Sequence, residues 1–245
     1  MKTAPITVKY INHLGSDLDV VNAARVSFDK ESDWEIDWNT GCNCFAKSEI
    51  ECSCESFYPD KALSEKDSKL IDYLAKHKHW SPFSHCYLKF RIKAPIFVAR
   101  QLQKHTVGLA WNEVSRRYVD SEPEFYFPDF WREKAENVKQ GSSLEPNDVY
   151  EDNMGFGPEF YVAMLRDEYM RLISCDVCPE QARMILPQNT VTEWIWSGSL
   201  AAFARVVKLR TYPHSQYETS LVAHGIKYHL DNLFPISTKA LLAYD

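Results

Sequence analysis

The stretch HCYLKFRIK, His85 to Lys93, alternates apolar and polar side chains without a break. Successive side chains of a β-strand point to opposite faces of the sheet, so a period of two predicts a strand with one face in the core and one in solvent. The apolar set is Cys86, Leu88, Phe90 and Ile92. We therefore expect an antiparallel sheet packed with helices.

Helical patterns lie on both sides of this stretch. Pro95 begins PIFVARQLQKH, in which Arg100 and Lys104 stand four residues apart and share one side of a helix. Upstream, Ser64 and Asp67 resemble an N-cap pair before an amphipathic segment. Patterns elsewhere predict a strand at 6–11, a helix in LDVVNAARVSF ending near Arg25, loops at 118–147, and helices at 160–173, 180–185, 199–209 and 215–233. Strands mainly in the N-terminal half and helices mainly in the C-terminal half predict an α+β fold.

The whole chain has the composition of an ordinary globular protein. Its 245 residues, 45% hydrophobic and 25% charged, fit a single domain, which we place at 1–245. No segment is apolar enough to span a membrane, and the N-terminus lacks the apolar core of a signal peptide, so we expect a cytoplasmic protein with reduced thiols. The net charge of -6 argues against nucleic-acid binding, because phosphate contacts need a basic surface.

An insertion around 29–61 lacks periodicity and carries CNCFAKSEIECSC. Residues two apart on a strand face the same way, so a hairpin could bring Cys42, Cys44, Cys52 and Cys54 to one tetrahedral zinc centre. Paired ligands in such centres usually have at least two residues between them, whereas here there is one. A flexible insertion is the favoured alternative, and we assign no metal.

The stretch KHTVGLAWNEVSRRY, Lys104 to Tyr118, crowds many kinds of polar side chain. With Arg100 included, four basic residues stand against one acidic residue, a surplus of three positive charges in an acidic chain. A small anionic ligand would suit this group. The charged residues are Arg100, Lys104, Arg116 and Arg117 against Glu113.

Two residue types in this stretch have competing interpretations. Ser115 lies in no nucleophile elbow and has no neighbouring base, so a hydrogen-bonding role is favoured over nucleophilic attack. For Arg116, a position on a solvated surface is as good an interpretation as a contact with a ligand. Arg117 follows Glu113 by four residues and Ser115 by two, a set suited to binding phosphate with the forked donors of a guanidinium.

Other candidate ligand contacts lie outside this stretch. Ser81 and Pro82 place a hydroxyl at a turn beside Trp80, an edge that would suit a flat aromatic ligand. Arg183, Arg205 and Arg210 lie among apolar neighbours, where an unpaired guanidinium is costly, so they either bind a ligand or form salt bridges. There is no GxGxxG or Walker loop, which excludes a standard Rossmann or P-loop nucleotide site.

Together these pieces resemble the flavin-dependent thymidylate synthases. The resemblance runs from AARVSF near residue 25 to HSQYE near residue 218, and its order and spacing make it specific. The matching blocks are HWSPFSH, KAPIFVARQ, WNEVSRRY, ARMILPQN and LRTYPHSQYE. The resemblance implies an α+β homotetramer with active sites at subunit interfaces, where residues of one chain complete a neighbour's pocket.

The resemblance also implies the reductive methylation of dUMP to dTMP, with methylenetetrahydrofolate as carbon donor and NADPH reducing a bound FAD. By match of position, Arg210 and Ser115 form the catalytic set, Arg210 as the cation that favours an electron-rich uracil ring and Ser115 as a ligand contact. The implied dUMP contacts are Gln101, Lys104, Glu113, Ser115, Arg117, Arg183 and Arg210. The implied FAD contacts are His79, Ser81, Lys104, His105, Thr106, Glu113 and Arg205.

The chain departs from the family pattern in places. Lys104-His105-Thr106 replaces Arg-His-Arg, and lysine keeps the charge but loses the bidentate fork. Ser199-Leu200-Ala201 replaces Asn-x-Arg, and Arg205, one helical turn beyond Ala201, is a candidate substitute for the missing flavin contact. Two alternatives stay open: a catalytically silent flavin or nucleotide-binding protein of the same fold, and a cysteine-centred metal module.

Overall fold

The structure is a computed structural model that describes residues 1–37, 60–136, 143, 145–147 and 155–244. The chain divides into two compact units. The first unit comprises Met1–Asn12, Leu88–Gly198 and Arg205–His229, and the second comprises His13–Tyr87, Ser199–Ala204 and Leu230–Asp245. A single domain over 1–245 stays a prediction. Among the described helices, none combines the length and the apolar character that a membrane span requires.

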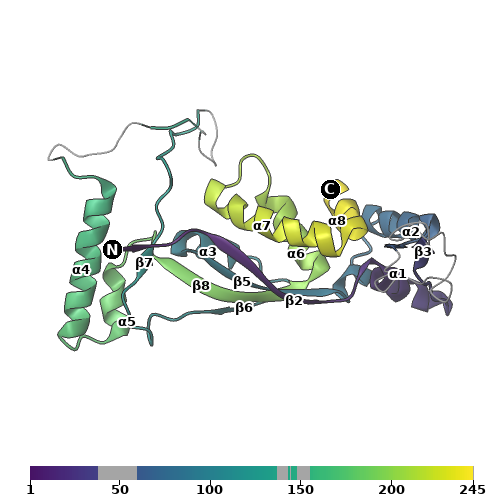
Figure 1. Cartoon of the computed structure of the whole chain (residues 1–245), viewed down its shortest axis with the longest axis horizontal. Coiled ribbons are helices and arrows are strands. Elements are labelled where there is room, and N and C mark those ends of the chain that lie inside the picture. Colours follow the sequence, from purple (N-terminus) through teal and green to yellow (C-terminus); the bar gives the residue numbers. More distant parts are fainter. Residues whose placement is uncertain (38–59, 137–142, 144, 148–154, 245) are drawn as a thin grey trace, which may run out of the picture. The chain divides into compact units, whose positions relative to one another are not determined.

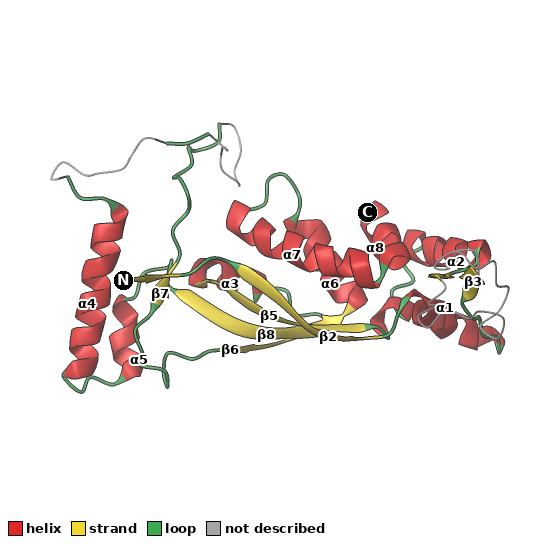
Figure 2. Ribbon diagram, viewed as in Figure 1, coloured by secondary structure: helices red, strands yellow, loops and turns green. Residues whose placement is uncertain are grey.

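A four-stranded sheet is the framework of the first unit (Figure 2). Its strands, in spatial order, are β2 (Thr7–Leu14), β5 (Tyr87–Pro95), β8 (Val191–Ser199) and β6 (Leu109–Glu113). The alternation predicted for β5 is confirmed, because Leu88, Phe90 and Ile92 are buried while the residues between them are exposed. The edge strand β6 runs antiparallel to β8.

Helices pack against this sheet. They are α3 (Ile96–Leu102), α6 (Leu200–Arg210) and α7 (Tyr217–Leu233). Helix α7 lies along β2 (Figure 1), where Tyr10 stacks on His229 with ring centroids 5.4 Å apart. A Cβ atom on Gly225 would lie 2.8 Å from a methyl of Val8, so only glycine permits this close approach of helix and strand. The buried face of α7 belongs to the core and includes Val222, Ala223 and Ile226.

The remaining elements of the first unit flank the sheet. The two-residue strands β1 (Lys2–Thr3) and β7 (Glu124–Phe125) pair in parallel. Helix α4 (Pro158–Ser174) is followed by α5 (Pro179–Ala182) and the 3₁₀ turn η3 (Arg183–Ile185). These segments bring Arg183 to the cavity that Glu113, at the end of β6, also lines.

The second unit is mainly helical. Its elements are α1 (Asp17–Arg25), η1 (Val26–Phe28), β3 (Glu35–Asp37), β4 (Asp60–Ala62), α2 (Glu65–Lys76), η2 (Pro82–Ser84) and α8 (Pro235–Ala243). Asp17 is buried at the start of α1, and its carboxylate accepts hydrogen bonds of 2.9 Å from the backbone N–H groups of Ile236 and Ser237. Because the first N–H groups of a helix have no partner within the helix, this carboxylate caps α8.

The predicted N-cap pair before α2 is confirmed. Ser64 Oγ accepts a hydrogen bond of 3.0 Å from the backbone N–H of Asp67, and it donates one of 2.8 Å to the Asp67 carboxylate. Arg25 and Ser32 also donate to this carboxylate. Burial raises the pKa of Asp67, but the hydrogen bonds from Arg25, Ser64 and Ser32 outweigh it and lower the pKa overall. Asp67 therefore ties α1 to α2 as an anion.

The predicted α+β fold is confirmed, with differences in detail. Strands β6 and β8, the short strands β1, β3 and β4, and helix α8 were not predicted. Strand β7 lies in a segment predicted as loops, and Pro95 is the N-cap of α3 rather than part of its first turn. Strand β8 lacks a regular period of two because its buried positions include neighbouring residues. The expectation about Cys42, Cys44, Cys52 and Cys54 falls outside the described residues.

Candidate active site

The end of β6 holds Glu113 in a fixed orientation. Its carboxylate accepts a hydrogen bond of 2.8 Å from Thr192 Oγ on β8 and one of 3.1 Å from Trp111 Nε1 on its own strand. Trp111 stacks on Trp194 of β8, with ring centroids 4.3 Å apart. Two donors from a rigid sheet therefore orient one carboxylate at the start of the loop that carries Ser115.

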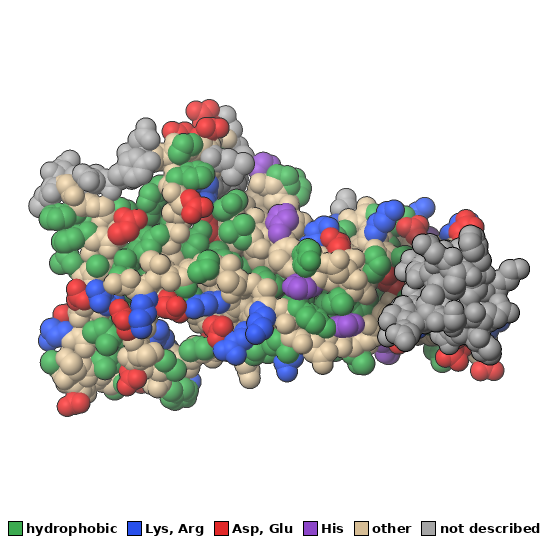
Figure 3. All heavy atoms as spheres, viewed as in Figure 1, with side chains coloured by type: hydrophobic (Ala, Val, Ile, Leu, Met, Phe, Trp, Pro, Cys, Tyr) green, Lys and Arg blue, Asp and Glu red, His purple; other side chains and the backbone are tan. Residues whose placement is uncertain are grey.

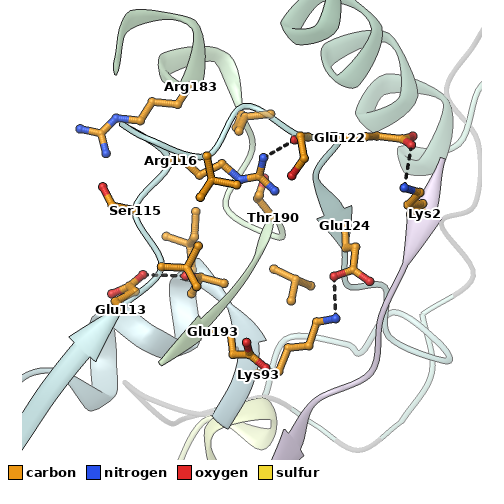
Figure 4. A pocket seen from close by; sticks show the side chains of 17 residues that line it. Lys2, Lys93, Glu113, Ser115, Arg116, Glu122, Glu124, Arg183, Thr190 and Glu193 are labelled. Atoms are coloured by element: carbon orange, nitrogen blue, oxygen red, sulfur yellow. Dashed lines mark hydrogen bonds and ion pairs between the residues drawn. The ribbon is translucent and has the colours of Figure 1, made fainter. Parts of the chain in front are cut away.

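A cavity of about 700 Å³ lies beside this loop. Glu113, Ser115 and Arg183 line it, and Figure 4 shows them on one side of the cavity. Lys93 and Glu124 lie on the opposite side in the same view. Three residues that the sequence assigned to dUMP thus meet around one cavity, although Arg183 is far from the other two in sequence.

Ion pairs lie around the side of this cavity opposite Ser115. Figure 3 shows basic and acidic side chains next to one another in the part of the molecule between α4 and the sheet. The pairs are Lys2 with Glu122, Arg166 with Glu122, Lys93 with Glu124, and Arg91 with Glu193. The hydrogen bond from Arg91 lowers the pKa of Glu193, although burial opposes it. These cations are largely neutralised by their own partners. Among the described residues, the positive charge that remains for a ligand therefore lies on the side of the cavity that carries Arg183.

The two arginines after Ser115 occupy different positions. Arg116 lines the cavity, donates a hydrogen bond to the backbone carbonyl of Ser121, and points into the cavity in Figure 4. Arg117 is exposed outside the lining, with its guanidinium 5.1 Å from the ring centroid of Tyr118. Its backbone N–H lies 3.3 Å from Ser115 Oγ. The sequence favoured Arg117 over Arg116, and the structure places Arg116 at the cavity.

A second group of assigned residues lies where α3 ends and α6 ends. Arg210 Nε donates a hydrogen bond of 3.0 Å to His105 Nε2, and Arg205 donates one of 2.8 Å to the backbone carbonyl of Val107. Burial, followed by the charges of Arg210 and Arg205, lowers the pKa of His105. A guanidinium can only donate, so His105 is neutral here and carries its proton on Nδ1.

The other assigned residues of the first unit lie near this group. Gln101 is on α3 and accepts a hydrogen bond from Thr219 of α7. Lys104 and Thr106 are exposed in the turn that follows α3. None of the residues around Arg210 and His105 is among the described residues that line the 700 Å³ cavity. Ser199 and Ala201, which stand where the family pattern has Asn-x-Arg, are both buried.

The remaining assigned residues, His79 and Ser81, lie in the second unit. They line a groove of about 1040 Å³ between α1, η1, α2 and the turn before η2, which we call the basic groove. Its lining includes the exposed ring of Trp80 and no Asp or Glu side chain among the described residues. Its cationic lining residues are Arg25, Lys30, Lys66, Lys69 and Lys78.

Several residues at these sites were missed from the sequence. Trp111 and Thr192 donate the hydrogen bonds that hold Glu113. Lys93 lies on the polar face of the predicted strand β5, but its ion pair with Glu124 depends on tertiary contacts. The lysines of the basic groove come from three separate segments, so no local sequence motif predicts that they lie together. Within the described part of the chain, no group of three or more His, Cys, Asp and Glu side chains could hold a metal ion.

Comparison with known proteins places the chain in a family. Residues 9–236 match the family model described as thymidylate synthase complementing protein. The chain is 30% identical over 237 residues to the flavin-dependent thymidylate synthase of Pseudothermotoga lettingae, covering 97% of this chain and 90% of that protein. It is 32% identical over 240 residues to a protein of the same name from Thermus thermophilus, covering 95% of this chain and 74% of that one.

A solved structure is similar over the full length. The UMP/dUMP methylase PolB from Streptomyces cacaoi, bound with 5-Br dUMP, superposes with a TM-score of 0.73 at 26% identity, covering 100% of this chain and 98% of that one. The similarity to known proteins therefore extends to the fold. The chain belongs to the thymidylate synthase complementing protein family, the family of the flavin-dependent thymidylate synthases.

Proposed function

We propose that this chain is an FAD-dependent thymidylate synthase that methylates dUMP to dTMP in the cytoplasm. Methylenetetrahydrofolate provides the carbon and NADPH provides the reducing equivalents. The observation that carries the proposal is the meeting of Glu113, Ser115 and Arg183 around one cavity. These residues belong to two family blocks that are distant in sequence, and their types suit a nucleotide monophosphate: a guanidinium for the phosphate, and a hydroxyl and a carboxylate for hydrogen bonding.

Arg210 is proposed as the residue that activates the uracil ring. Burial lowers its pKa, but a guanidinium stays protonated at neutral pH, so the cation is retained in a partly desolvated place. A cation near N3 and the flanking carbonyls of uracil stabilises negative charge on the ring, and carbon 5 then becomes the better nucleophile. Because the ring itself attacks the carbon donor, the reaction needs no protein nucleophile, and Ser115 acts as a ligand contact.

His105 is proposed to fix the orientation of Arg210. Its Nε2 accepts from Arg210 Nε, which leaves the two terminal nitrogens of the guanidinium for a ligand; no partner for those nitrogens occurs among the described residues. A fixed guanidinium loses less conformational entropy when it binds its ligand. Lys104, the residue before His105, is proposed to add positive charge beside this pair. The side chain of Gln101 accepts a hydrogen bond from Thr219.

The residues expected to contact FAD fit an anionic cofactor with flat rings. The basic groove offers His79 and Ser81 as hydrogen-bonding groups, the ring of Trp80 as a stacking surface, and no carboxylate among its described lining residues. The other proposed FAD contacts, His105, Thr106 and Arg205, belong to the first unit. When bound, FAD supplies hydride transfer, which none of the protein side chains can perform.

A homotetramer with interfacial active sites is proposed for the assembly. Helix α4 exposes apolar side chains at positions that share one side of the helix: Phe160, Tyr161, Met164 and Leu165. Met164 is 55% exposed, and a cluster of this kind marks an interaction surface. Self-association would bury it and would let residues of one chain complete the pocket of a neighbour.

Release of tritium from dUMP labelled at carbon 5 tests the proposal. The purified chain should be yellow, and it should release tritium only when methylenetetrahydrofolate and NADPH are both present, because the hydrogen at carbon 5 leaves when the new bond forms. A yellow protein without tritium release would instead indicate the catalytically silent alternative. A colourless protein that retains no FAD when the cofactor is added would contradict both.

A further inference from the structure

In the described part of the chain, three of the four lysines that line the basic groove have no acidic partner. Two of its five cations are already paired: Arg25 with the buried Asp67, and Lys69 with Glu65 at 2.6 Å. The other three, Lys30, Lys66 and Lys78, are exposed, and none has an acidic partner in the described part of the chain. Three unneutralised ammonium groups in a groove without a described carboxylate form a site for a multiply charged anion.

These lysines come from three segments that converge on the groove. Lys30 follows η1, Lys66 is in the first turn of α2, and Lys78 is in the turn after α2. Lys66 lies near a helix N-terminus, where a cation is unfavourable unless it serves another purpose. Lys78 has a φ of 58°, the left-handed conformation in which many helices end, and its side chain lines the groove. Lys66 is therefore unfavourable for α2 itself, and it keeps a positive charge at the groove.

The groove also presents flat apolar surfaces. Phe28 is 76% exposed, Trp80 is 68% exposed and Tyr73 is 52% exposed, and all three line the groove. Large aromatic side chains are normally buried, so three exposed rings beside three lysines without a described acidic partner indicate a ligand that combines rings with phosphates. The volume of about 1040 Å³ is at the upper end of small-molecule pockets, which suits a dinucleotide better than a mononucleotide.

We propose that the basic groove binds the diphosphate of an adenine dinucleotide, with Lys30, Lys66 and Lys78 contacting phosphate oxygens and Trp80 stacking on a ring of the same ligand. This inference rests on the proposed function, in which both FAD and NADPH carry that chemistry. It assigns the phosphate contacts to residues that none of the family blocks contains. It also provides positive charge in a chain where Ser199 and Ala201 are buried and offer none.

Calorimetric titration of the full-length apo-protein with ADP, FAD and NADPH tests the inference. The variant K30A/K66A/K78A should bind ADP, and at least one of the two dinucleotides, about tenfold or more weakly than the wild type, with a smaller dependence on salt. The charge-preserving variant K30R/K66R/K78R should retain most of the affinity. The control K76A removes a lysine on α2 that does not line the groove, and it should bind as the wild type does.

The dinucleotide whose affinity falls together with that of ADP is the occupant, so the two titrations separate FAD from NADPH. Thermal unfolding of each variant shows that the binding losses do not come from misfolding, and W80A should weaken the same dinucleotide. Unchanged affinity of the triple alanine variant for ADP, FAD and NADPH would overturn the inference. Tritium release by the wild type is measured separately, so a failure here leaves the proposed function standing.

Discussion

Arg210 and His105 form the hydrogen-bonded pair on which the proposed chemistry depends. The pair joins the end of α6 to the segment after α3, and both side chains are partly buried. A donor that is fixed before the ligand arrives contributes more to catalysis than one that must be ordered during the reaction. The pair therefore makes specific predictions for each partner.

Replacing Arg210 should remove most of the activity without unfolding the protein. R210A loses the cation that stabilises charge on the uracil ring, and we expect tritium release to fall by about 100-fold or more, as for the loss of one preorganised donor. R210K keeps the charge but loses the Nε donor, so its rate should lie between the two. A rate for R210A equal to that of the wild type would contradict the assigned role.

The lowered pKa of His105 predicts a pH dependence of stability. In the unfolded chain this imidazole has the ordinary histidine pKa of 6.5, whereas the folded state takes up the proton only at lower pH. The unfolded state therefore binds more protons as the pH falls below 6.5, and the contribution of His105 to the free energy of unfolding, complete above that value, declines from there through the lower folded pKa.

Urea unfolding at several pH values measures this effect. The difference in unfolding free energy between the wild type and H105Q should become less favourable to the wild type as the pH is lowered, because glutamine can accept from Arg210 but does not titrate. A difference that stays constant across the same pH range would show that His105 does not titrate differently in the two states.

At the scale of elements, capping makes a prediction about the second unit. D17A leaves two backbone N–H groups of α8 without their buried acceptor, and it should lower the free energy of unfolding by about 2 kcal/mol. The matched control D19A removes an exposed carboxylate of the same helix, which accepts only from Ser16 among the described residues, and should cost much less. Equal losses in the two variants would mean that Asp17 has no special role at α8.

Elements with a clean apolar period could be predicted from the sequence, and elements without one could not. Strand β5 and helix α2 have clean apolar periods, and both were found. Strand β8 is a central strand whose buried positions fall on both faces, so its sequence VTEWIWSGS shows no alternation. Strand β6 lies inside the polar motif, and its residues drew a functional interpretation rather than a structural one.

The candidate site was predictable to a similar extent. Glu113, Ser115 and Arg183 were assigned through the family blocks, and the structure brings them to one cavity. Which of Arg116 and Arg117 faces that cavity depends on the path of the loop after β6, which no local pattern reveals. Thr192 contacts Glu113 only because β8 lies beside β6, a strand pairing between segments distant in sequence.

At the scale of the whole molecule, the exposed side of α4 predicts self-association. M164E places a charge in the centre of the apolar cluster, and desolvating it in an interface is costly, so the proposed tetramer should dissociate into smaller species in analytical ultracentrifugation. The control S174E adds the same charge to an exposed position at the end of the same helix. A wild-type chain that sediments as a monomer would contradict the proposed assembly.

The central claim is that positive side chains from distant parts of the chain gather around one pyrimidine nucleotide. A crystal structure of the protein with FAD and dUMP tests this most directly. We predict that Ser115, Arg183 and Arg210, from one chain or from neighbouring chains, lie within hydrogen-bond distance of the same dUMP molecule. Density for dUMP with all three side chains directed away from it would contradict the account.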